Sequence, residues 1–286
     1  MRRWDSCTLP TVASSKNGNI IQLAGRQTHY LKEGSGPPLI LLHGYFYDCQ
    51  MWNRNIETLA KHYTVYALDL WGAGLSCRGR LDFSYTLFAN QVSLFMDSIG
   101  IETAAFCGQG MGGGTIIHFA SLHPQRVDRM ILVDTAGLPD TVPWTARLLR
   151  SPLIALPLFK FPGTAVRRHI LRSHFVGNHQ ILEQEYVDEV TAFQTIRGSS
   201  RCLLDMLQAE FFHSLQDSIE VLSKHEIPAL IVWGENDHSN PLCQGQKLQQ
   251  LLPGSRLDIL SDAGHVSNAD QPEAFNQLSL GFLGNL

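Results

Sequence analysis

Short apolar runs alternate with longer segments of helical spacing through the first half of the chain, and this alternation strongly limits the folds available to it. Pro38 to Leu42, "PLILL", is an unbroken apolar run, which is typical of a strand buried on both faces. Met111 to Leu122 has the length of a helix and stops before Pro124. Such alternation predicts a mostly parallel sheet with helices packed on both faces.

The other expected core elements follow from the same two patterns. The further strands are expected at Ile20 to Leu23 and Gln27 to Leu31, which form an opening hairpin, and at Thr64 to Leu68, Thr103 to Cys107, Met130 to Val133, Ala229 to Trp233 and Arg256 to Leu260. The further helices are expected at Met51 to Lys61, Ser84 to Ile99, Gln246 to Leu252 and Pro272 to Leu283.

The alternation stops between Gly137 and about Phe212, where helical runs and turns occur without a convincing strand. Leu182 to Thr195 and Arg201 to Phe211 have helical patterns. An all-helical insertion between two sheet strands predicts a cap over the carboxyl ends of the strands. We therefore expect residues 1–136 and 214–286 to form one core, with residues 137–213 as its helical cap.

Composition excludes several classes of function. The formal net charge is −4 and no basic run occurs, so nucleic acid is not an expected partner. No stretch reaches the roughly 18 apolar residues of a membrane span, and none follows the basic start as in a signal peptide. The six cysteines are scattered, which favours reduced thiols and a cytoplasmic location. The twelve histidines lack metal-ligand spacing, so no metal is expected, and the sequence implies no cofactor.

The segment "AFCGQGMGGG", residues 105–114, ends an expected strand and begins an expected helix. Gly108 and Gly112 have the spacing of a G-x-S-x-G elbow, the sharp turn that presents a nucleophilic serine. Small residues at these positions let strand and helix approach closely across a strained bend. The nucleophile position is Gly110, which has no side chain with which to attack. Cys107 belongs to the strand, so we expect its thiol to be buried and inert.

Residues able to transfer protons follow the last two expected strands, at the sheet edge where open parallel sheets bind ligands. Asp237 follows the strand at Ala229 to Trp233, and His265 follows the strand at Arg256 to Leu260. An imidazole with a pKa near 6.5 takes and returns a proton at neutral pH. A buried carboxylate beside it fixes the tautomer and stabilises the imidazolium. The pair therefore suits general-base catalysis.

These motifs together resemble the α/β-hydrolase fold enzymes, in which nucleophile, acid and base follow one another in this order. The resemblance extends from the segment "HGYF" at His43, through "DLWGAGLS" at Asp69, to His265. It points to the cap-bearing branch, which includes small carboxylesterases, lactonases and carbon–carbon bond hydrolases. It implies an eight-stranded, mostly parallel sheet and a Ser-His-Asp mechanism without a cofactor. In that branch the serine would sit at Gly110.

The same resemblance assigns the other catalytic positions. Asp237 is implied as the triad acid and His265 as the base. Asp134 also ends an expected strand, and some members of the family carry their acid there, so Asp134 stays an alternative. His43 and Asp69 are expected to brace neighbouring loops. The implied oxyanion hole consists of the backbone N–H groups of Met111 and of Tyr45 or Phe46.

Aromatic residues at strand ends and in the insertion predict an apolar pocket for an acyl or aryl group. The candidate lining residues are Tyr45, Phe46, Trp71 and Trp144. Epoxide hydrolases usually have a proline after His-Gly and an aspartate at the elbow, and this chain has neither. Carbon–carbon hydrolases commonly carry tryptophan after the catalytic histidine, where this chain has Val266. A small apolar ester is therefore the expected substrate.

Three functions are compatible with glycine at the elbow. The first is an esterase scaffold inactivated by the loss of its serine, whether by engineering or by recent change. The second is a non-catalytic homologue that binds a small apolar ligand under the cap. The third is an enzyme in which His265 and Asp237 act as a general-base pair without a covalent intermediate.

Overall fold

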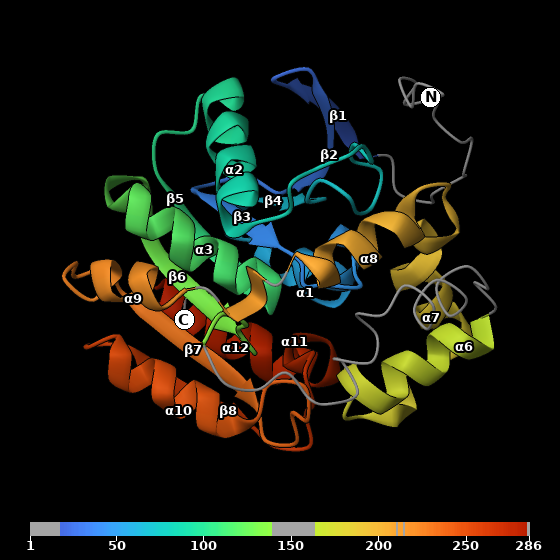
Figure 1. Cartoon of the computed structure of the whole chain (residues 1–286). Helices are drawn as coiled ribbons and strands as arrows, with labels where there is room; N and C mark the ends of the chain where they lie inside the picture. Colours follow the sequence, from blue (N-terminus) through green and yellow to red (C-terminus); the bar gives the residue numbers. More distant parts are fainter. Residues whose placement is uncertain (1–17, 139–163, 210, 214, 285–286) are drawn as a thin grey trace.

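The computed structural model describes residues 18–138, 164–209, 211–213 and 215–284 of the 286-residue chain. In these residues eight strands form one sheet, in the order β1-β2-β4-β3-β5-β6-β7-β8 (Figure 1). Successive strands pair in parallel from β4 through β3, β5, β6 and β7 to β8, whereas β2 is antiparallel to both β1 and β4. The predicted fold class is confirmed. The strands are β1 (Asn19–Leu23), β2 (Arg26–Glu33), β3 (Pro38–Leu42), β4 (Thr64–Leu68), β5 (Ala104–Gln109), β6 (Val127–Val133), β7 (Ala229–Gly234) and β8 (Arg256–Leu260).

The central strands are buried because helices cover both faces of the sheet. Every residue of β5 and β7 is buried, as is β3 after its first residue. The strand β8 forms an edge of the sheet, and Ile259 in it is 46% exposed. Unbroken apolar runs therefore lie at the centre of the sheet, as expected for parallel strands.

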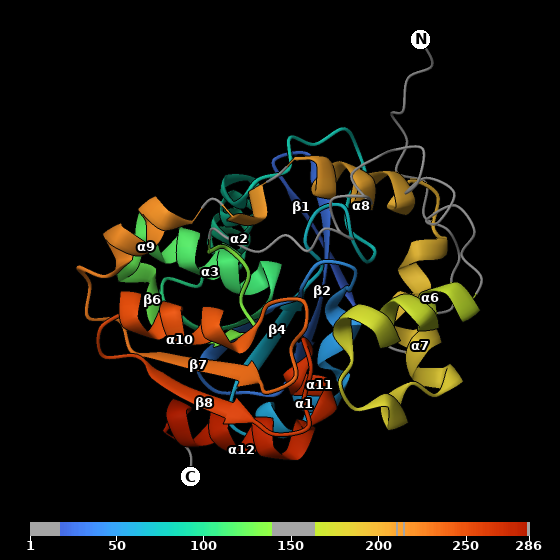
Figure 2. The ribbon, with the colours of Figure 1, turned by 60° about the horizontal axis from the view of Figure 1, so that its bottom comes forward.

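Two sets of helices enclose the sheet and define two hydrophobic cores. One face packs against α1 (Asn53–Leu59), α11 (Ser267–Asp270) and α12 (Pro272–Leu283). The other packs against α2 (Tyr85–Ile99), α3 (Met111–Leu122), α9 (Gln216–Leu222) and α10 (Leu242–Leu251). Figure 2 shows α1 and α12 on the opposite side of the strands from α2 and α3.

The boundaries of α2 show how local sequence defines a helix. The hydroxyl of Ser84 accepts the N–H of Leu87 at 3.1 Å and so caps the first turn. Gly100 ends the helix at φ 72°, a left-handed conformation that glycine adopts without a steric penalty. Both positions agree with the predicted limits of this helix.

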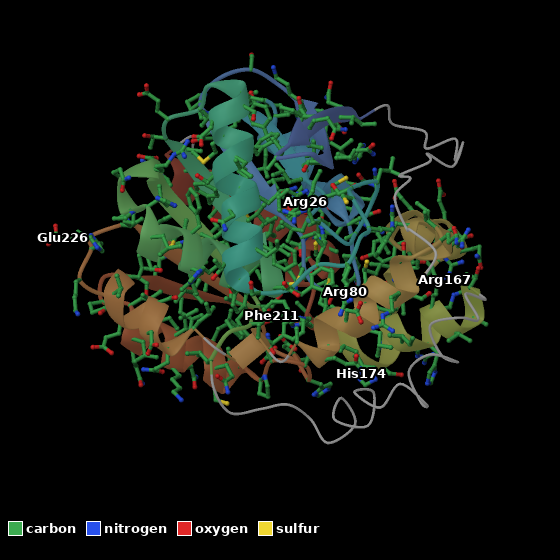
Figure 3. All side chains as sticks on the ribbon, turned by 45° about the horizontal axis from the view of Figure 1, so that its top comes forward. Arg26, Arg80, Arg167, His174, Phe211 and Glu226 are labelled. Atoms are coloured by element: carbon green, nitrogen blue, oxygen red, sulfur yellow. The ribbon has the colours of Figure 1, made fainter. Side chains whose placement is uncertain are left out.

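The described residues between β6 and β7 form helices joined by turns, and none of them is in a strand. They include α6 (Thr164–Ile170), the π-helical segment Leu171–Phe175, α7 (Gln184–Thr191) and α8 (Ser199–Gln208), followed by α9. Helices α6 and α7 lie together at one end of the molecule (Figure 1), the end where Figure 3 places Arg167 and His174. The predicted cap limits of 137 and 213 stay a prediction, because residues 139–163 lie outside the described part.

None of the described helices has the length and apolar character needed to cross a membrane.

Candidate active site

Gly110 forms a sharp turn between β5 and α3. Its φ of 51° and ψ of −112° are strained for a residue with a side chain, whereas glycine adopts them readily. Three backbone hydrogen bonds hold this shape. The Gly110 N–H donates to the Val133 carbonyl at 2.9 Å, and the Gly110 carbonyl accepts the N–H groups of Gly114 at 3.1 Å and Ala136 at 3.0 Å. The turn is therefore built independently of any side chain at its apex.

Close backbone contact brings the start of α3 onto the ends of β3 and β5. A Cβ atom on Gly112 would lie 2.2 Å from the Leu42 carbonyl oxygen, so only glycine fits there. A Cβ atom on Gly108 would likewise lie 2.6 Å from the carbonyl carbon of Gly112. The two flanking glycines thus have the packing role that the sequence predicts.

The predicted acid and base lie together beside this turn. Nδ1 of His265 is 2.8 Å from Oδ2 of Asp237. The other ring nitrogen, Nε2, is 3.3 Å from the place where a Cβ atom on Gly110 would be. The other carboxylate oxygen of Asp237 accepts the N–H groups of Ser239 and Asn240, both at 2.8 Å, which holds the carboxylate in place. Two loops that are remote in sequence thus converge on the elbow.

The surroundings of His265 favour its protonated form. Burial by itself lowers the pKa of His265, because a buried charge loses its hydration. The charge and the hydrogen bond of Asp237 outweigh that loss, with a further contribution from Asp134, so the pKa of His265 is raised above its usual value of 6.5. This ring is therefore a better base than an exposed histidine.

Asp134 occupies a different position from Asp237, although both are buried. Its Oδ1 accepts the Gly234 N–H at 2.8 Å, and its Oδ2 accepts the Ser267 N–H at 3.0 Å. Burial, followed by the nearby charge of Asp237, raises the pKa of Asp134 to about 7. The carboxyl group of Asp134 therefore links the ends of β6 and β7 to the start of α11, while His265 pairs with Asp237.

The candidate oxyanion groups come from the start of α3 and from the loop after β3. Met111 is the first residue of α3, where a backbone N–H has no partner within the helix. Tyr45 and Phe46 follow β3 directly after Gly44. Here His43 braces the loop as predicted, since its Nδ1 donates to the Gly44 carbonyl at 2.8 Å and its Nε2 accepts the Leu70 N–H at 3.0 Å.

Aromatic side chains pack beside the His265 ring, and we call Phe46, Phe175, Tyr45 and Phe212 together the aromatic wall. The rings of Phe46 and Phe175 are stacked with centroids 5.7 Å apart, and Phe175 also packs against His265 at 5.7 Å. Tyr45 contacts Phe212 edge-on at 5.6 Å. Phe175 and Phe212 come from the helical insertion, and the sequence offered no signal for their proximity to the site because both resemble ordinary packing residues.

Two predicted lining residues are not brought to this wall by the described contacts. Trp71 is 1% exposed, its indole N–H donates to the Thr28 hydroxyl at 2.9 Å, and the Arg26 guanidinium lies over its ring at 4.9 Å. These contacts pack Trp71 against β2. Trp144 lies outside the described residues.

Gln109, directly before the elbow, has a role that the sequence analysis missed. It is 1% exposed, and its side-chain amide donates to the His265 carbonyl at 2.5 Å. Its amide oxygen lies so near Gly44 that a Cβ atom there would be 1.9 Å away. One side chain therefore contacts both the histidine loop and the loop after β3.

One cluster of described residues has the composition of a metal site. The ligand atoms of His29, Cys49 and Asp69 all lie within 4.8 Å of one another. The carboxylate oxygens of Asp69 already accept His29 Nδ1 at 2.7 Å, the Cys49 N–H at 2.8 Å and the Leu75 N–H at 2.7 Å. Burial also raises the pKa of the Cys49 thiol, which disfavours a thiolate ligand. The cluster fits a hydrogen-bond brace for the turn after β4, the role predicted for Asp69.

The family model for the alpha/beta hydrolase fold matches residues 37–272. Because this match covers most of the chain, the protein belongs to that family. It therefore shares the fold class whose elbow and loop geometry are described above.

Known proteins support a hydrolase scaffold. A protein of Mycobacterium tuberculosis, described only as uncharacterized, is 31% identical over 258 residues, covering 85% of this chain and 74% of the relative. A carboxylesterase of Bacillus subtilis is 26% identical over 271 residues, covering 90% of this chain and 84% of the relative. The structure of a meta-cleavage product hydrolase from Pseudomonas fluorescens, a serine-to-alanine mutant complexed with acetates, has a TM-score of 0.81 and 26% identity, covering 93% of this chain and 97% of that one.

Proposed function

We propose that this chain is the scaffold of a carboxylic ester hydrolase of the Ser-His-Asp type, inactive because Gly110 occupies the nucleophile position. One observation carries the proposal. The His265 ring, paired with Asp237 through Nδ1, directs Nε2 to within 3.3 Å of where a Cβ atom on Gly110 would lie. A serine oxygen lies one bond beyond Cβ, within hydrogen-bonding reach of that nitrogen.

The arrangement supports acyl transfer once a hydroxyl group is present. Nε2 of His265 would take the serine proton as the oxygen attacks the ester carbonyl carbon, while Asp237 stabilises the imidazolium. The N–H groups of Met111 and of Tyr45 or Phe46 would stabilise the negative charge on the carbonyl oxygen. His265 would then return the proton to the departing alcohol, and water would release the acyl group by the same steps. In the chain as it stands, the attacking oxygen is missing.

The aromatic wall and the residue after His265 support a small apolar ester as the substrate. Phe46 and Phe175 offer flat apolar surface beside His265. Val266 directly follows the histidine and is fully buried, where carbon–carbon hydrolases commonly carry a tryptophan. Likeness to a Bacillus subtilis carboxylesterase agrees with ester hydrolysis, whereas the meta-cleavage product hydrolase represents the competing carbon–carbon reaction.

The decisive experiment is Gly110→Ser, assayed with p-nitrophenyl acetate and butyrate. Loss of a triad nucleophile costs on the order of 10⁶ in kcat in a well-studied serine protease, so we expect the serine to raise turnover by about 10³ or more. A side chain in this strained backbone should also lower the free energy of unfolding by about 1–3 kcal/mol.

Gly110→Ala is the matched control, because it adds the same Cβ atom and backbone strain without a hydroxyl group. We expect it to fold with the stability of Gly110→Ser and to show no turnover. A folded serine variant that is no faster than this alanine variant would refute the proposed mechanism.

The same assay separates the two other functions. A general-base enzyme would be supported by the position of Nε2 facing the space above Gly110, and it requires turnover by the unaltered chain that His265→Ala abolishes. A ligand-binding homologue requires tight binding of a small apolar ligand, measured by calorimetry, with no gain of activity from Gly110→Ser.

We also propose a cap at residues 137–213, with residues 1–136 and 214–286 as the core, and a cytoplasmic location. The insertion carries Phe175 and Phe212, which contact Phe46 and Tyr45 at the site. The scattered cysteines support a reducing compartment, and nucleic acid is not a proposed partner.

A further inference from the structure

A short piece of the insertion, residues 174–178, contacts the loops that carry the proposed catalytic pair. The Ser239 hydroxyl, two residues after Asp237, donates to the carbonyl of His174. The Phe175 ring packs against His265 and against Phe46. The insertion is therefore attached directly to the acid loop, the base and the loop after β3.

Asp270 links the insertion to the histidine loop through backbone hydrogen bonds. Its Oδ2 accepts the N–H of Gly177, from the insertion, at 2.8 Å and the N–H of Gly264, the residue before His265, at 2.7 Å. The two backbones touch there, since a Cβ atom on Gly177 would lie 2.3 Å from the Gly264 nitrogen. One carboxylate oxygen thus holds two chain segments that are far apart in sequence.

The second oxygen of the Asp270 carboxylate is buried without a hydrogen bond in the described part of the chain. Asp270 is 2% exposed, and its Oδ1 has no hydrogen-bond partner among the residues that the structure describes. Burial raises the pKa of Asp270, although the N–H groups of Gly264, Gly177 and Asn178 oppose the rise. A buried polar atom without a partner costs free energy, which offsets part of what the two N–H contacts of Oδ2 contribute to stability.

We propose that Asp270 is a positioning residue that couples the insertion to His265, by holding Gly264 and Gly177 on a single oxygen. The inference rests on the proposed function for the role of His265 as the base. When residues 174–178 are seated on the core, Gly264 is held and the imidazole stays paired with Asp237. When they lift away, the histidine loop loses one side of its support, and Nε2 no longer faces the elbow.

The first test uses the chain with Gly110 unchanged, so that it does not depend on esterase activity. In Asp270→Leu we expect hydrogen exchange of the Gly177 and Gly264 amides to rise together by about tenfold or more. We expect the low-field NMR signal of the His265 Nδ1 proton, which reports the hydrogen bond to Asp237, to broaden or disappear.

Two comparison variants distinguish the positioning role of Asp270 from the effect of its charge and from a general weakening of the contact between insertion and core. Asp270→Asn removes the same charge but keeps an oxygen for both N–H groups, so the His265 signal should be retained. Gln194→Met removes another bond between the insertion and the core, the amide donation to the Phe46 carbonyl at 2.9 Å, and should leave the His265 signal unchanged. If Asp270→Leu does not fold, Asp270→Ser gives the same test, because a hydroxyl is too short to reach both amides.

The second test adds these changes to Gly110→Ser. We expect Asp270→Leu to lower kcat at least tenfold with little change in KM, and Asp270→Asn to restore most of it. An unchanged His265 signal in a folded leucine or serine variant would overturn the coupling, whether or not Gly110→Ser is active. If Asp270→Leu displaces His265 while Gly110→Ser alone is inactive, the coupling is supported and the proposed function is refuted.

Discussion

Two imidazole–carboxylate pairs in this molecule have nearly the same geometry but different surroundings. His265 lies 2.8 Å from Asp237 beside the elbow, and His29 lies 2.7 Å from Asp69 between β2 and the turn after β4. All four side chains are buried. The hydrogen bond within each pair therefore does not by itself distinguish a base from a structural brace.

The difference lies at the second ring nitrogen. Nε2 of His265 faces the space above Gly110, where a Cβ atom would still be 3.3 Å away. Nε2 of His29 packs against Gly18 so closely that a Cβ atom there would lie 2.0 Å away. An imidazole acts as a base only if a reacting group can reach its free nitrogen, so the geometry agrees with the base proposed for His265 and with a bracing role for His29.

The largest expected effect contrasts the two histidines in catalysis. In the Gly110→Ser form, His265→Gln should lower kcat by about 10⁴ or more, since the serine loses its general base. His29→Gln in the same form should leave kcat within about threefold for the protein that folds. Steady-state kinetics with a p-nitrophenyl ester checks both values. Equal losses from the two substitutions would abolish the distinction drawn between the pairs.

The second effect concerns stability at the bracing pair. His29→Leu should lower the free energy of unfolding by about 3–5 kcal/mol, because it removes the imidazole from the buried Asp69 carboxylate and leaves the N–H groups of Cys49 and Leu75 as its hydrogen-bond donors. Adding Asp69→Asn should recover part of that loss, because the uncompensated charge is then gone. Urea unfolding measures both. A double variant that is less stable than the single variant by the full cost of Asp69→Asn alone would show that the two residues act independently.

The smallest expected effect is a difference in how the carboxyl groups near the two pairs make the free energy of unfolding depend on pH. The pKa of Asp134, beside Asp237, is raised to about 7, so the folded chain holds a proton that the unfolded chain releases from about pH 4 upward. Stability should therefore fall as pH rises from about 4 to 7, by at most about 1.4 kcal/mol per pH unit for one proton.

Ionisation of Asp69 makes stability depend on pH in the opposite direction. Burial would raise the pKa of Asp69, but the hydrogen bond and charge of His29 hold it below its usual value, so its contribution is lost only as pH falls below that value. Unfolding measured from pH 5 to 8 should show a shallower fall in Asp134→Asn than in the unaltered chain. An unchanged slope would mean that Asp134 is ionised throughout this range.

Local patterns were sufficient for much of the fold. The limits of β3, β4, β8, α3 and α12 agree with the prediction, because apolar runs, helical spacing and proline stops act within a few residues. The strand β5 continues two residues beyond its predicted end at Cys107. Gly108 and Gln109 have the composition of a turn, yet they pair with Leu132 and Val133 of β6. Neighbouring strands therefore decided where this strand ends.

Part of the candidate site could also be predicted from local patterns, and part could not. The order of the elbow, Asp237 and His265 could be predicted, because each follows a strand and parallel strands end at one edge of the sheet. The helix α9 and the aromatic contacts of Phe175 were missed. Apolar residues in an insertion have no local feature that separates core packing from contact with a site.

The sequence by itself determined a mostly parallel α/β sheet, a strand-to-helix turn with glycine at its apex, and an aspartate and a histidine after the last two strands. Only the tertiary structure decided that Asp134 binds backbone amides while Asp237 pairs with His265, and that Asp270 joins Gly264 to Gly177. The physical reason is range. Periodicity and turn chemistry act between neighbours in the chain, whereas a hydrogen bond between remote loops depends on positions that only the assembled core defines.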